Sequence, residues 1–406
     1  MQFLNDSASI VFIQHVILTK LSKEESVKLS KIRNSLLALG CPLGLLAMSS
    51  QAYGAALQMF SDINYANPAE LSMIKVGQLM LGTGIVNAHI RYQGTVYGVN
   101  GVANATMTND LSYGRFAWRT SPKIVVALAV TQPVFADINF GPNSFVSPIT
   151  TDTLVKTINI APRMSYQVTP QLSLGIGLDL EYKYLNRLDF QVAGLGVVKN
   201  HSTGFFPGFD LGAFYIFNQS TFGSVSFYSR RPGNTTGTST SESGLQNGSY
   251  SVYNIDPYIV QVHLTRIVTP KLLLSGGVYF SNWATIKHLP LKNTVLGNLT
   301  FPTKWSNVWS YELGGKYDAN EHFSLLFGGM YETNFVSNQL NSIGYPGSSV
   351  LILAGGLSSP LTKKLSGQLM YARIMFAPDA KFSSFINTGS ASLGVNMISA
   401  RLTYDF

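Results

Sequence analysis

Hydrophobic and polar residues alternate along most of this chain, and the clearest example is the stretch 172–184. Leucine, isoleucine and tyrosine occupy every second position there, with serine, glycine, aspartate, glutamate and lysine between them. A period of two residues predicts a β-strand with two opposed faces. One face of this strand is aliphatic and ends in tyrosines, whereas the other carries small and charged groups. This arrangement is typical of a wall between lipid and a wet lumen.

Short polar turns recur roughly every 50 residues along the chain and separate pairs of such strands. They lie at 119–123, 168–171, 217–221, 268–271, 318–321 and 360–363. Between successive turns the chain has room for an outgoing strand, a longer connection and a returning strand. Counting these elements gives about 14 strands, an even number as single-chain bacterial barrels require. The pattern therefore predicts an all-β, antiparallel transmembrane β-barrel.

The longer connections are expected at the end of the barrel opposite the turns. They fall near 138–153, 188–206, 231–252, 287–306, 335–348 and 377–390. The segment 231–250 is rich in Ser, Thr, Gly and Asn, a composition that would also suit an interdomain linker. Because the hairpin rhythm continues on both sides of it, we expect a mobile surface loop there. One strand of these hairpins is predicted at Ile124–Ile138.

The composition of the chain favours a membrane barrel over a soluble protein of several domains. Charged residues make up 12% of the sequence, against about 25% in ordinary soluble proteins. No uninterrupted apolar run of about 18 residues occurs, so spanning helices are not predicted. A closed barrel is the other structure that satisfies backbone polar groups in lipid. The net charge of +8 comes from scattered basic residues, which argues against a nucleic-acid-binding face.

The first 52 residues are predicted to be an export signal. Five basic residues precede an apolar core at Leu36–Met48, and Ser50-Gln51-Ala52 is a small-x-small cleavage site. A buried N-terminal helix is the alternative, but it would have to contain Pro42 and Gly44.

The only cysteine, Cys41, lies inside this apolar core. The mature protein would then carry neither disulfide nor thiol chemistry. A lipoprotein signal would be cut just before the cysteine, but the apolar core continues past it. We therefore do not expect lipidation.

The motif Asn67-Pro68-Ala69 follows the signal after a short interval, and its proline predicts a rigid turn. Asn-Pro-Ala between an export signal and a barrel resembles the FadL-type family of outer-membrane transporters. Further segments that resemble this family are 121–133, 158–166, 169–178 and 309–317. The resemblance spans nearly the whole mature chain. It implies an outer-membrane protein of a Gram-negative bacterium that passes long-chain fatty acids or other hydrophobic compounds without energy coupling.

The same resemblance assigns roles to two groups of residues. A segment ahead of and including Asn67, Pro68 and Ala69 forms a hatch inside the barrel of the family, so 53–75 is expected to be a short hatch and 76–406 the barrel. Ligand leaves family members sideways through a kink in the third strand, which corresponds here to the strand with Pro133. Proline cannot donate to the ladder. The expected lateral gate consists of Ala129, Thr131, Gln132 and Pro133. The alternative is that Pro133 only ends the strand beyond the membrane.

The sequence lacks the motifs of an enzyme. Its six histidines are far apart, and no nucleophile elbow, metal-ligand cluster or phosphate-binding glycine loop accompanies them. We therefore expect no catalysis, no metal site and no cofactor. Alternation places several charged residues on lumenal faces, where a hydrated network that stiffens the barrel is favoured over ligand binding. These residues are Arg163, Asp179, Glu181, Lys183, Glu312, Lys316, Arg401 and Asp405.

The chain ends in an alternating strand whose last residue is Phe406. By resemblance, a terminal Phe is the signature that the barrel assembly machinery recognises. The expected partners are this machinery, outer-membrane lipid and hydrophobic small molecules such as long-chain fatty acids, and not nucleic acid. Two alternatives stay open. A tightly filled lumen would favour a structural or adhesin-type barrel that does not transport, and a continuous polar pore would favour a general porin.

The cleavage site generates the first testable prediction. The mature protein should begin near Tyr53, because the small-x-small motif ends at Ala52. N-terminal sequencing of the protein from purified outer membranes measures this directly. A purified protein that still carries residues 36–48 would contradict the prediction.

Overall fold

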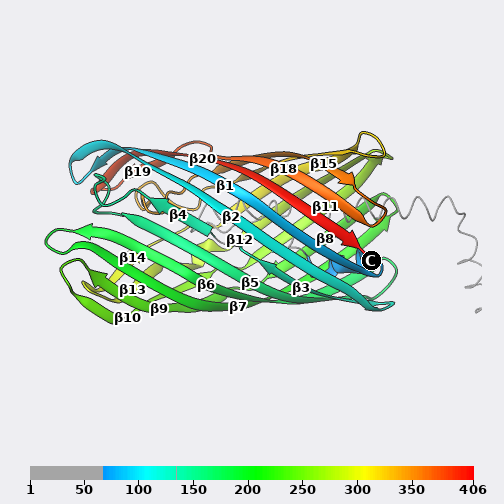
Figure 1. Cartoon of the computed structure of the whole chain (residues 1–406), viewed down its shortest axis with the longest axis horizontal. Coiled ribbons are helices and arrows are strands. Elements are labelled where there is room, and N and C mark those ends of the chain that lie inside the picture. The colour runs from blue at the N-terminus through cyan, green and yellow to red at the C-terminus, as the bar shows by residue number, and fades with distance from the viewer. Residues whose placement is uncertain (1–66, 134) are drawn as a thin grey trace, which may run out of the picture. The chain divides into compact units, whose positions relative to one another are not determined.

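The computed structural model describes residues 67–133 and 135–406. The predicted signal peptide and hatch residues 53–66 lie outside this part of the chain. Fourteen strands form a closed antiparallel barrel, as predicted (Figure 1). In wall order they are β1 (Gly77–Val96), β2 (Val99–Ser121), β3 (Ile124–Thr131), β5 (Asp152–Gln167), β6 (Leu172–Val192), β7 (Gly196–Asn218), β8 (Thr221–Tyr228), β11 (Ile259–Thr269), β12 (Leu272–Ser281), β15 (Val308–Asp318), β16 (Ser324–Glu332), β17 (Val350–Pro360), β18 (Leu365–Phe376) and β20 (Asn387–Asp405).

The ring closes where the last strand meets the first. β20 pairs with β1 over the whole interval from Gln78–Asp405 to Val96–Asn387. Closure removes the two sheet edges, whose free N–H and C=O groups lipid could not satisfy. Two short 3₁₀ helices, η1 (Pro68–Met73) and η2 (Trp283–Thr285), complete the regular elements. Within the described residues no helix is long and apolar enough to cross a membrane.

Six further strands extend the barrel at the end opposite the short turns (Figure 1). They are β4 (Phe135–Asn139), β9 (Arg231–Ser241), β10 (Gln246–Asp256), β13 (His288–Thr294), β14 (Gly297–Pro302) and β19 (Ala380–Ser383). The prediction of a mobile loop at 231–250 is wrong, since this segment forms most of the β9–β10 hairpin. It is fixed on both sides, because β9 pairs with β7 and β10 pairs with β13. Its threonines are β-branched and suit a strand, but their small polar character hides the alternation.

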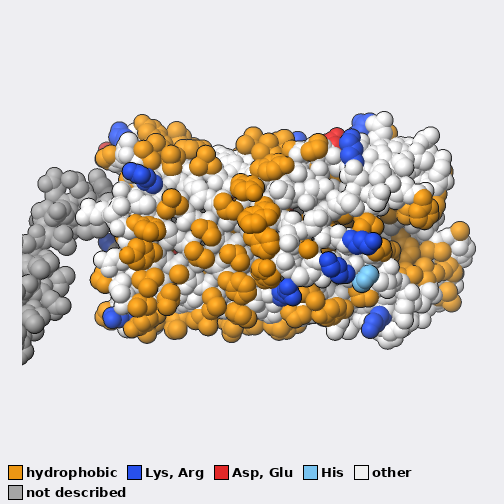
Figure 2. Space-filling view, turned by 180° about the vertical axis from the view of Figure 1, so that it is seen from behind, with side chains coloured by type: hydrophobic (Ala, Val, Ile, Leu, Met, Phe, Trp, Pro, Cys, Tyr) orange, Lys and Arg blue, Asp and Glu red, His pale blue; other side chains and the backbone are white. Residues whose placement is uncertain are grey.

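The outer wall carries the apolar band that the alternation predicted. On β6, Leu174, Ile176 and Leu178 are exposed, whereas Asp179 and Glu181 are buried. Figure 2 shows how apolar side chains cover the barrel surface on the face drawn there. A row of aromatic rings crosses β7, β8, the residue just before β11, β12 and β15, with successive centroids 6.1, 6.0, 6.0 and 4.9 Å apart. The row consists of Phe209, Phe227, Tyr258, Phe280 and Trp309. Aromatic girdles of this kind mark a membrane–water interface.

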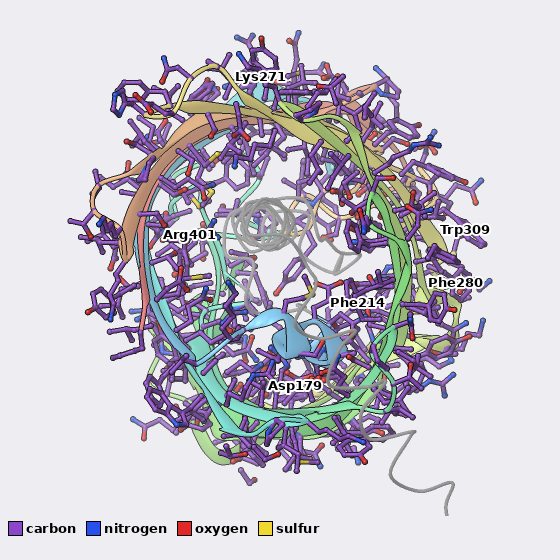
Figure 3. The ribbon with its side chains drawn as sticks, turned by 90° about the vertical axis from the view of Figure 1, so that its right-hand side faces the viewer. Asp179, Phe214, Lys271, Phe280, Trp309 and Arg401 are labelled. Atoms are coloured by element: carbon purple, nitrogen blue, oxygen red, sulfur yellow. The ribbon has the colours of Figure 1, made fainter. Side chains whose placement is uncertain are left out.

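The short helix η1, which follows Asn67, lies against the inner wall within the ring of strands (Figure 3, blue). The Asn67 side-chain Nδ2 donates to the carbonyls of Ala213 at 3.1 Å and Val225 at 2.9 Å, which belong to β7 and β8. Its Oδ1 accepts from the backbone N–H of Ala69 at 2.9 Å and so caps η1. The Ser165 hydroxyl on β5 donates to the Ala69 carbonyl at 3.0 Å. One asparagine therefore both shapes the turn and fixes it to the barrel.

Arg119 and two glycines hold the rest of this turn in place. The Arg119 guanidinium donates to the Ser72 carbonyl at 2.6 Å and, through Nε, to the Ile74 carbonyl at 2.9 Å. A Cβ atom on Gly212 of β7 would overlap the Asn67 Oδ1, and one on Gly175 of β6 would overlap the Ala69 nitrogen. Glycine at both wall positions is what permits the close approach.

This contact predicts that Gly212→Ala releases the turn from the wall while the barrel still closes. Loss of a docking contact of about 1–3 kcal/mol should speed proteolysis of the segment before β1 by about tenfold. The measurement is the cleavage rate of detergent-solubilised protein, with the heat-dependent gel shift as the check of barrel folding. Gly276→Ala on β12 is the matched control, because its new Cβ would meet no atom closer than 3.6 Å. Equal cleavage rates for the two variants would contradict the prediction.

Candidate functional site

One side of the lumen carries a network of buried charges. Arg163 on β5 contacts Asp210 on β7, with Nε and Oδ2 3.0 Å apart, and Asp179 on β6, with Nη2 and Oδ1 3.4 Å apart. The Asn159 amide donates to the same Asp179 oxygen at 2.8 Å. All of these side chains are buried. Three neighbouring strands are thus joined from the inside.

A second group of charges continues the network toward the extended end. Arg231 on β9 reaches Glu181 at 2.8 Å and Asp256 on β10 at 3.5 Å. Lys183 pairs with Asp256 at 3.3 Å, and its ammonium lies 3.9 Å from the centre of the Phe206 ring. The two groups together contain three cations and four carboxylates, all buried. Each cation therefore already has a carboxylate partner.

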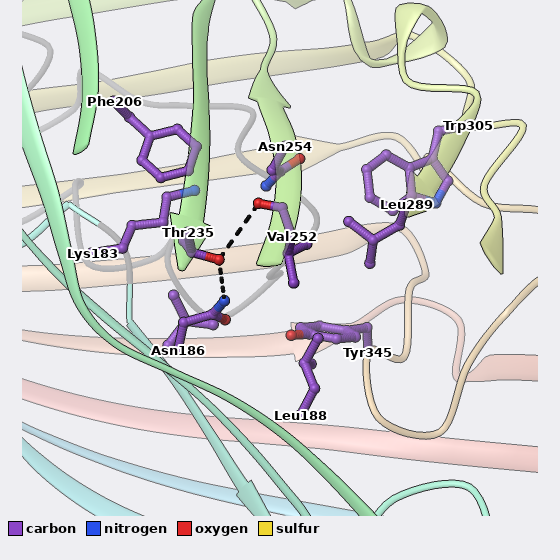
Figure 4. A pocket seen from close by; sticks show the side chains of 11 residues that line it. Lys183, Asn186, Leu188, Phe206, Thr235, Val252, Asn254, Leu289, Trp305 and Tyr345 are labelled. Carbon is purple, nitrogen blue, oxygen red and sulfur yellow. Dashed lines mark hydrogen bonds between the residues drawn. The ribbon is translucent and has the colours of Figure 1, made fainter. Parts of the chain in front are cut away.

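A pocket of about 60 Å³ lies next to Lys183 (Figure 4). Its lining comprises Val155, Lys183, Asn186, Leu188, Phe206, Thr235, Val252, Asn254, Leu289, Trp305 and Tyr345. The polar groups of this lining bond to one another: Asn186 donates to the Thr235 hydroxyl at 3.3 Å, and that hydroxyl donates to the Val252 carbonyl at 3.5 Å. Burial raises the pKa of Tyr345, on the connection between β16 and β17, so its phenol stays neutral. The surface left for a ligand is mainly aliphatic and aromatic, as in most small-molecule sites.

The opposite side of the lumen is largely apolar, with a few buried polar groups such as Glu332 and Arg401, and the sequence reasoning did not identify this. Its inward side chains come from β1, β2, β16, β17, β18 and β20 and form one buried cluster. On β1 the apolar Val86, Ala88 and Ile90 are buried, while Asn87 and His89 between them are exposed. At these positions of the β1–β2 hairpin the apolar face points inward. On β6, by contrast, the apolar face points outward. The inverted alternation was the signal that could have revealed the apolar face.

The wall lacks a hydrogen-bond ladder at one place between β2 and β4. Pairing of β2 with β3 ends at Gly114–Val130, and pairing of β3 with β5 ends at Thr131–Asn159. β4 resumes pairing with β5 at Phe135–Lys156. Across the described residues, β4 shares no paired rung with β2, whose segment 99–113 pairs only with β1. We call this region, β2 residues 99–113 facing β4, the unpaired seam.

The unpaired seam begins at the border of the apolar band. Val130 and its β5 partner Ile160, at the lower edge of the seam, are both exposed apolar residues on the outer wall. From there toward the short turn at 121–124, β2 and β3 stay paired as far as the rung Ser121–Ile124. The stretch 124–138 is therefore divided into β3 and β4 at this break. The ladder stops because proline offers no N–H and the register with β5 shifts by one residue across the break.

The expected gate residues occupy different positions relative to this break. Ala129 is buried and paired on both sides, with Arg115 and Ala161, so it lies in intact wall just below the unpaired seam. Thr131 is the last rung with β5, Gln132 is half-buried, and Pro133 is buried within the break. The structure thus brings three of the four to the unpaired seam. Their role in ligand release stays a prediction.

The part of the chain that the structure describes holds no group of three or more His, Cys, Asp or Glu side chains placed to bind a metal ion. The described lumen combines a charged wall, a largely apolar wall, a small pocket and an unpaired seam.

Solved structures share this barrel. A FadL homologue from Pseudomonas aeruginosa is similar with a TM-score of 0.75 and 16% identity, covering 89% of this chain and 99% of that chain. The toluene transporter TodX of Pseudomonas putida is similar with a TM-score of 0.65 and 16% identity, over 89% and 96% of the two chains. The monoaromatic hydrocarbon channel CymD has a TM-score of 0.62 and 15% identity, over 93% and 97%. Identities this low show a common fold.

The family comparison adds sequence evidence to the shared fold. No curated protein matches this chain in sequence. The family model described as outer membrane protein transport protein (OMPP1/FadL/TodX) matches residues 47–384, which is most of the chain. The chain therefore belongs to the OMPP1/FadL/TodX family of β-barrel proteins in the outer membrane of Gram-negative bacteria.

Proposed function

We propose that this protein carries neutral hydrophobic compounds passively through the outer membrane and releases them sideways at the unpaired seam. The observation that carries the proposal is the continuity of the apolar lumenal face. One buried cluster contains Tyr92 and Phe382 near the extended end, whose rings are 5.2 Å apart, and Met107 and Leu111 on β2 beside the unpaired seam. Ala136 and Ile138 of β4 belong to the same cluster. An apolar solute thus has apolar contacts up to the break in the ladder.

Passive release into the bilayer needs no further energy source. Moving apolar surface from water into hydrocarbon is favourable by about 0.8 kcal/mol for each CH₂ group. The unpaired seam adjoins the apolar band at Val130 and Ile160. A solute released beside Val130 and Ile160 would enter lipid directly, without passing through the aqueous periplasmic end of the barrel.

The charges around the pocket support a neutral substrate over a fatty-acid anion. Lys183 is the one cation among the residues that line the described pocket, and Asp256 already pairs with it. A buried carboxylate head would need a cation of its own, and the neighbouring network has more carboxylates than cations. Two of the similar structures are described as transporters or channels for toluene and monoaromatic hydrocarbons. Long-chain fatty acids, which the sequence resemblance implied, fit this charge balance less well.

The lateral route predicts that bulk at the break stops transport. Gln132→Trp or Ala129→Trp should reduce uptake of radiolabelled toluene to the level of cells without the protein, because the indole would fill the lower edge of the unpaired seam. Leu353→Trp on β17, whose side chain is half-exposed on the lipid face, is the matched control and should transport normally. All three variants should keep the heat-dependent gel shift of a folded barrel. Normal uptake by the folded Gln132→Trp and Ala129→Trp proteins would exclude this exit.

The charge balance predicts a preference within pairs of compounds that differ only in charge. Toluene should be taken up faster than benzoate, and hexadecanol faster than hexadecanoate. Lys183→Met should leave the uptake of the neutral compounds nearly unchanged, since Arg231 still faces Asp256. A substrate carboxylate that paired with Lys183 would instead lose about ten- to a hundredfold in this variant. Faster uptake of the anions, abolished by Lys183→Met, would contradict the neutral substrate class and leave lateral release intact.

A further inference from the structure

A side-chain hydrogen bond crosses the unpaired seam. The Asn109 amide Nδ2 on β2 donates to Asp137 Oδ2 on β4 at 3.3 Å. Asn109 is 8% exposed and Asp137 is partly buried. Neighbouring strands elsewhere in the wall are joined by backbone hydrogen bonds. Between β2 and β4, the hydrogen bond joins two side chains instead.

The Asn109 end of this bond lies among apolar side chains. Met107 and Leu111 flank Asn109 on the same face of β2 and are buried, whereas Ala136 and Ile138, the buried neighbours of Asp137 in sequence, point to the other face of β4. An amide among such neighbours is costly to bury unless it has a partner. The bond therefore fixes β4 beside β2 at a defined position, which apolar contacts alone would not do.

The geometry also makes the bond easy to break and remake. At 3.3 Å it is longer than the 2.7–2.9 Å typical of strong charge-assisted bonds. Rotation about side-chain torsions separates its two atoms, whereas opening a backbone ladder would require whole strands to move. The β5 side of β4 stays paired from Phe135–Lys156 to Asn139–Asp152, so the strand would remain attached to the wall.

We propose that Asn109 and Asp137 form a latch that holds the unpaired seam closed between passages and parts when a hydrophobic solute leaves. This inference rests on the proposed lateral release and names the residues that control it. With the latch closed, water from the lumen would not reach the lipid beside the unpaired seam. Because the latch can open, a solute could still leave there. Asn109 and Asp137 would set the rate of release and not the affinity of the pocket.

Reversible cross-linking tests the latch. Cysteines at Asn109→Cys and Asp137→Cys are joined in membranes by a short bifunctional methanethiosulfonate reagent, which tolerates a wider separation than a direct disulfide. Toluene uptake should fall to background after cross-linking and recover after reduction. The matched control is Asn87→Cys with Thr108→Cys, a pair across the fully laddered β1–β2 seam whose native side chains also bond, at 3.0 Å. Cross-linking the control pair should leave uptake unchanged.

Single substitutions provide a second readout if the cysteine pair folds poorly. Asn109→Ala and Asp137→Ala should each raise the uptake rate about two- to tenfold, the range expected for loss of one net hydrogen bond. The double variant should add nothing to either single variant, because both remove the same bond. Asp137→Asn keeps an acceptor and should restore a near-native rate. Additive effects, or a slower rate in every variant, would overturn the latch.

The outcomes separate the latch from the exit itself. If Gln132→Trp stops uptake but the cross-linked Asn109→Cys/Asp137→Cys protein transports normally, the lateral exit stands and the latch is wrong. If neither change affects uptake, both the exit and the latch are wrong. Loss of uptake in the cross-linked control pair as well would assign the effect to general stiffening of the hairpin and would also overturn the latch.

Discussion

Hydrogen bonding of the backbone is the constraint on which the rest of this structure depends. Every N–H and C=O group at membrane depth needs a partner within the protein, because hydrocarbon offers none. The chain meets this demand by closing β20 onto β1 and by pairing β3 with both β2 and β5 up to Gly114–Val130 and Thr131–Asn159. Beyond these rungs the ladder between β2 and β4 is absent, at the edge of the apolar band. We propose the lateral exit there because opening it breaks no backbone ladder.

The interior divides into a rigid half and an adaptable half. Arg163 and Arg231 tie β5, β6, β7, β9 and β10 together through buried carboxylates, and breaking such a pair costs about 3–5 kcal/mol. The turn at Asn67 is docked on this charged side. The other half is held mainly by apolar packing, with scattered hydrogen bonds such as Arg401 to Gln368 and Asn109 to Asp137, and it contains the unpaired seam. Dispersion contacts have no fixed partners, so this half can accommodate a passing solute without leaving a polar group unsatisfied.

Local patterns in the sequence predicted the wall, and long-range register explains what they missed. The alternation at 172–184, the short turns and the strand ending at Phe406 identified the barrel, its strand number and its closure. Alternation cannot show that Asn109 faces Asp137 or that Arg163 meets Asp210, because these contacts depend on how distant strands align. The β9–β10 hairpin was missed because serine and threonine on both faces leave no hydrophobic period. The turn at Asn67 was expected from one motif, but Gly175 and Gly212, which let it approach the wall, could be recognised only from the fold.

Photoaffinity labelling in native outer membranes tests the central claim most directly. A small neutral aromatic diazirine would be supplied from outside and activated during uptake, and its attachment sites would be mapped by mass spectrometry. Passage through the unpaired seam predicts adducts on Met107, Leu111 and Val130, and excess toluene should suppress them. Adducts confined to the short-turn end of the lumen, near residues 119–123 and 217–221, would contradict lateral release.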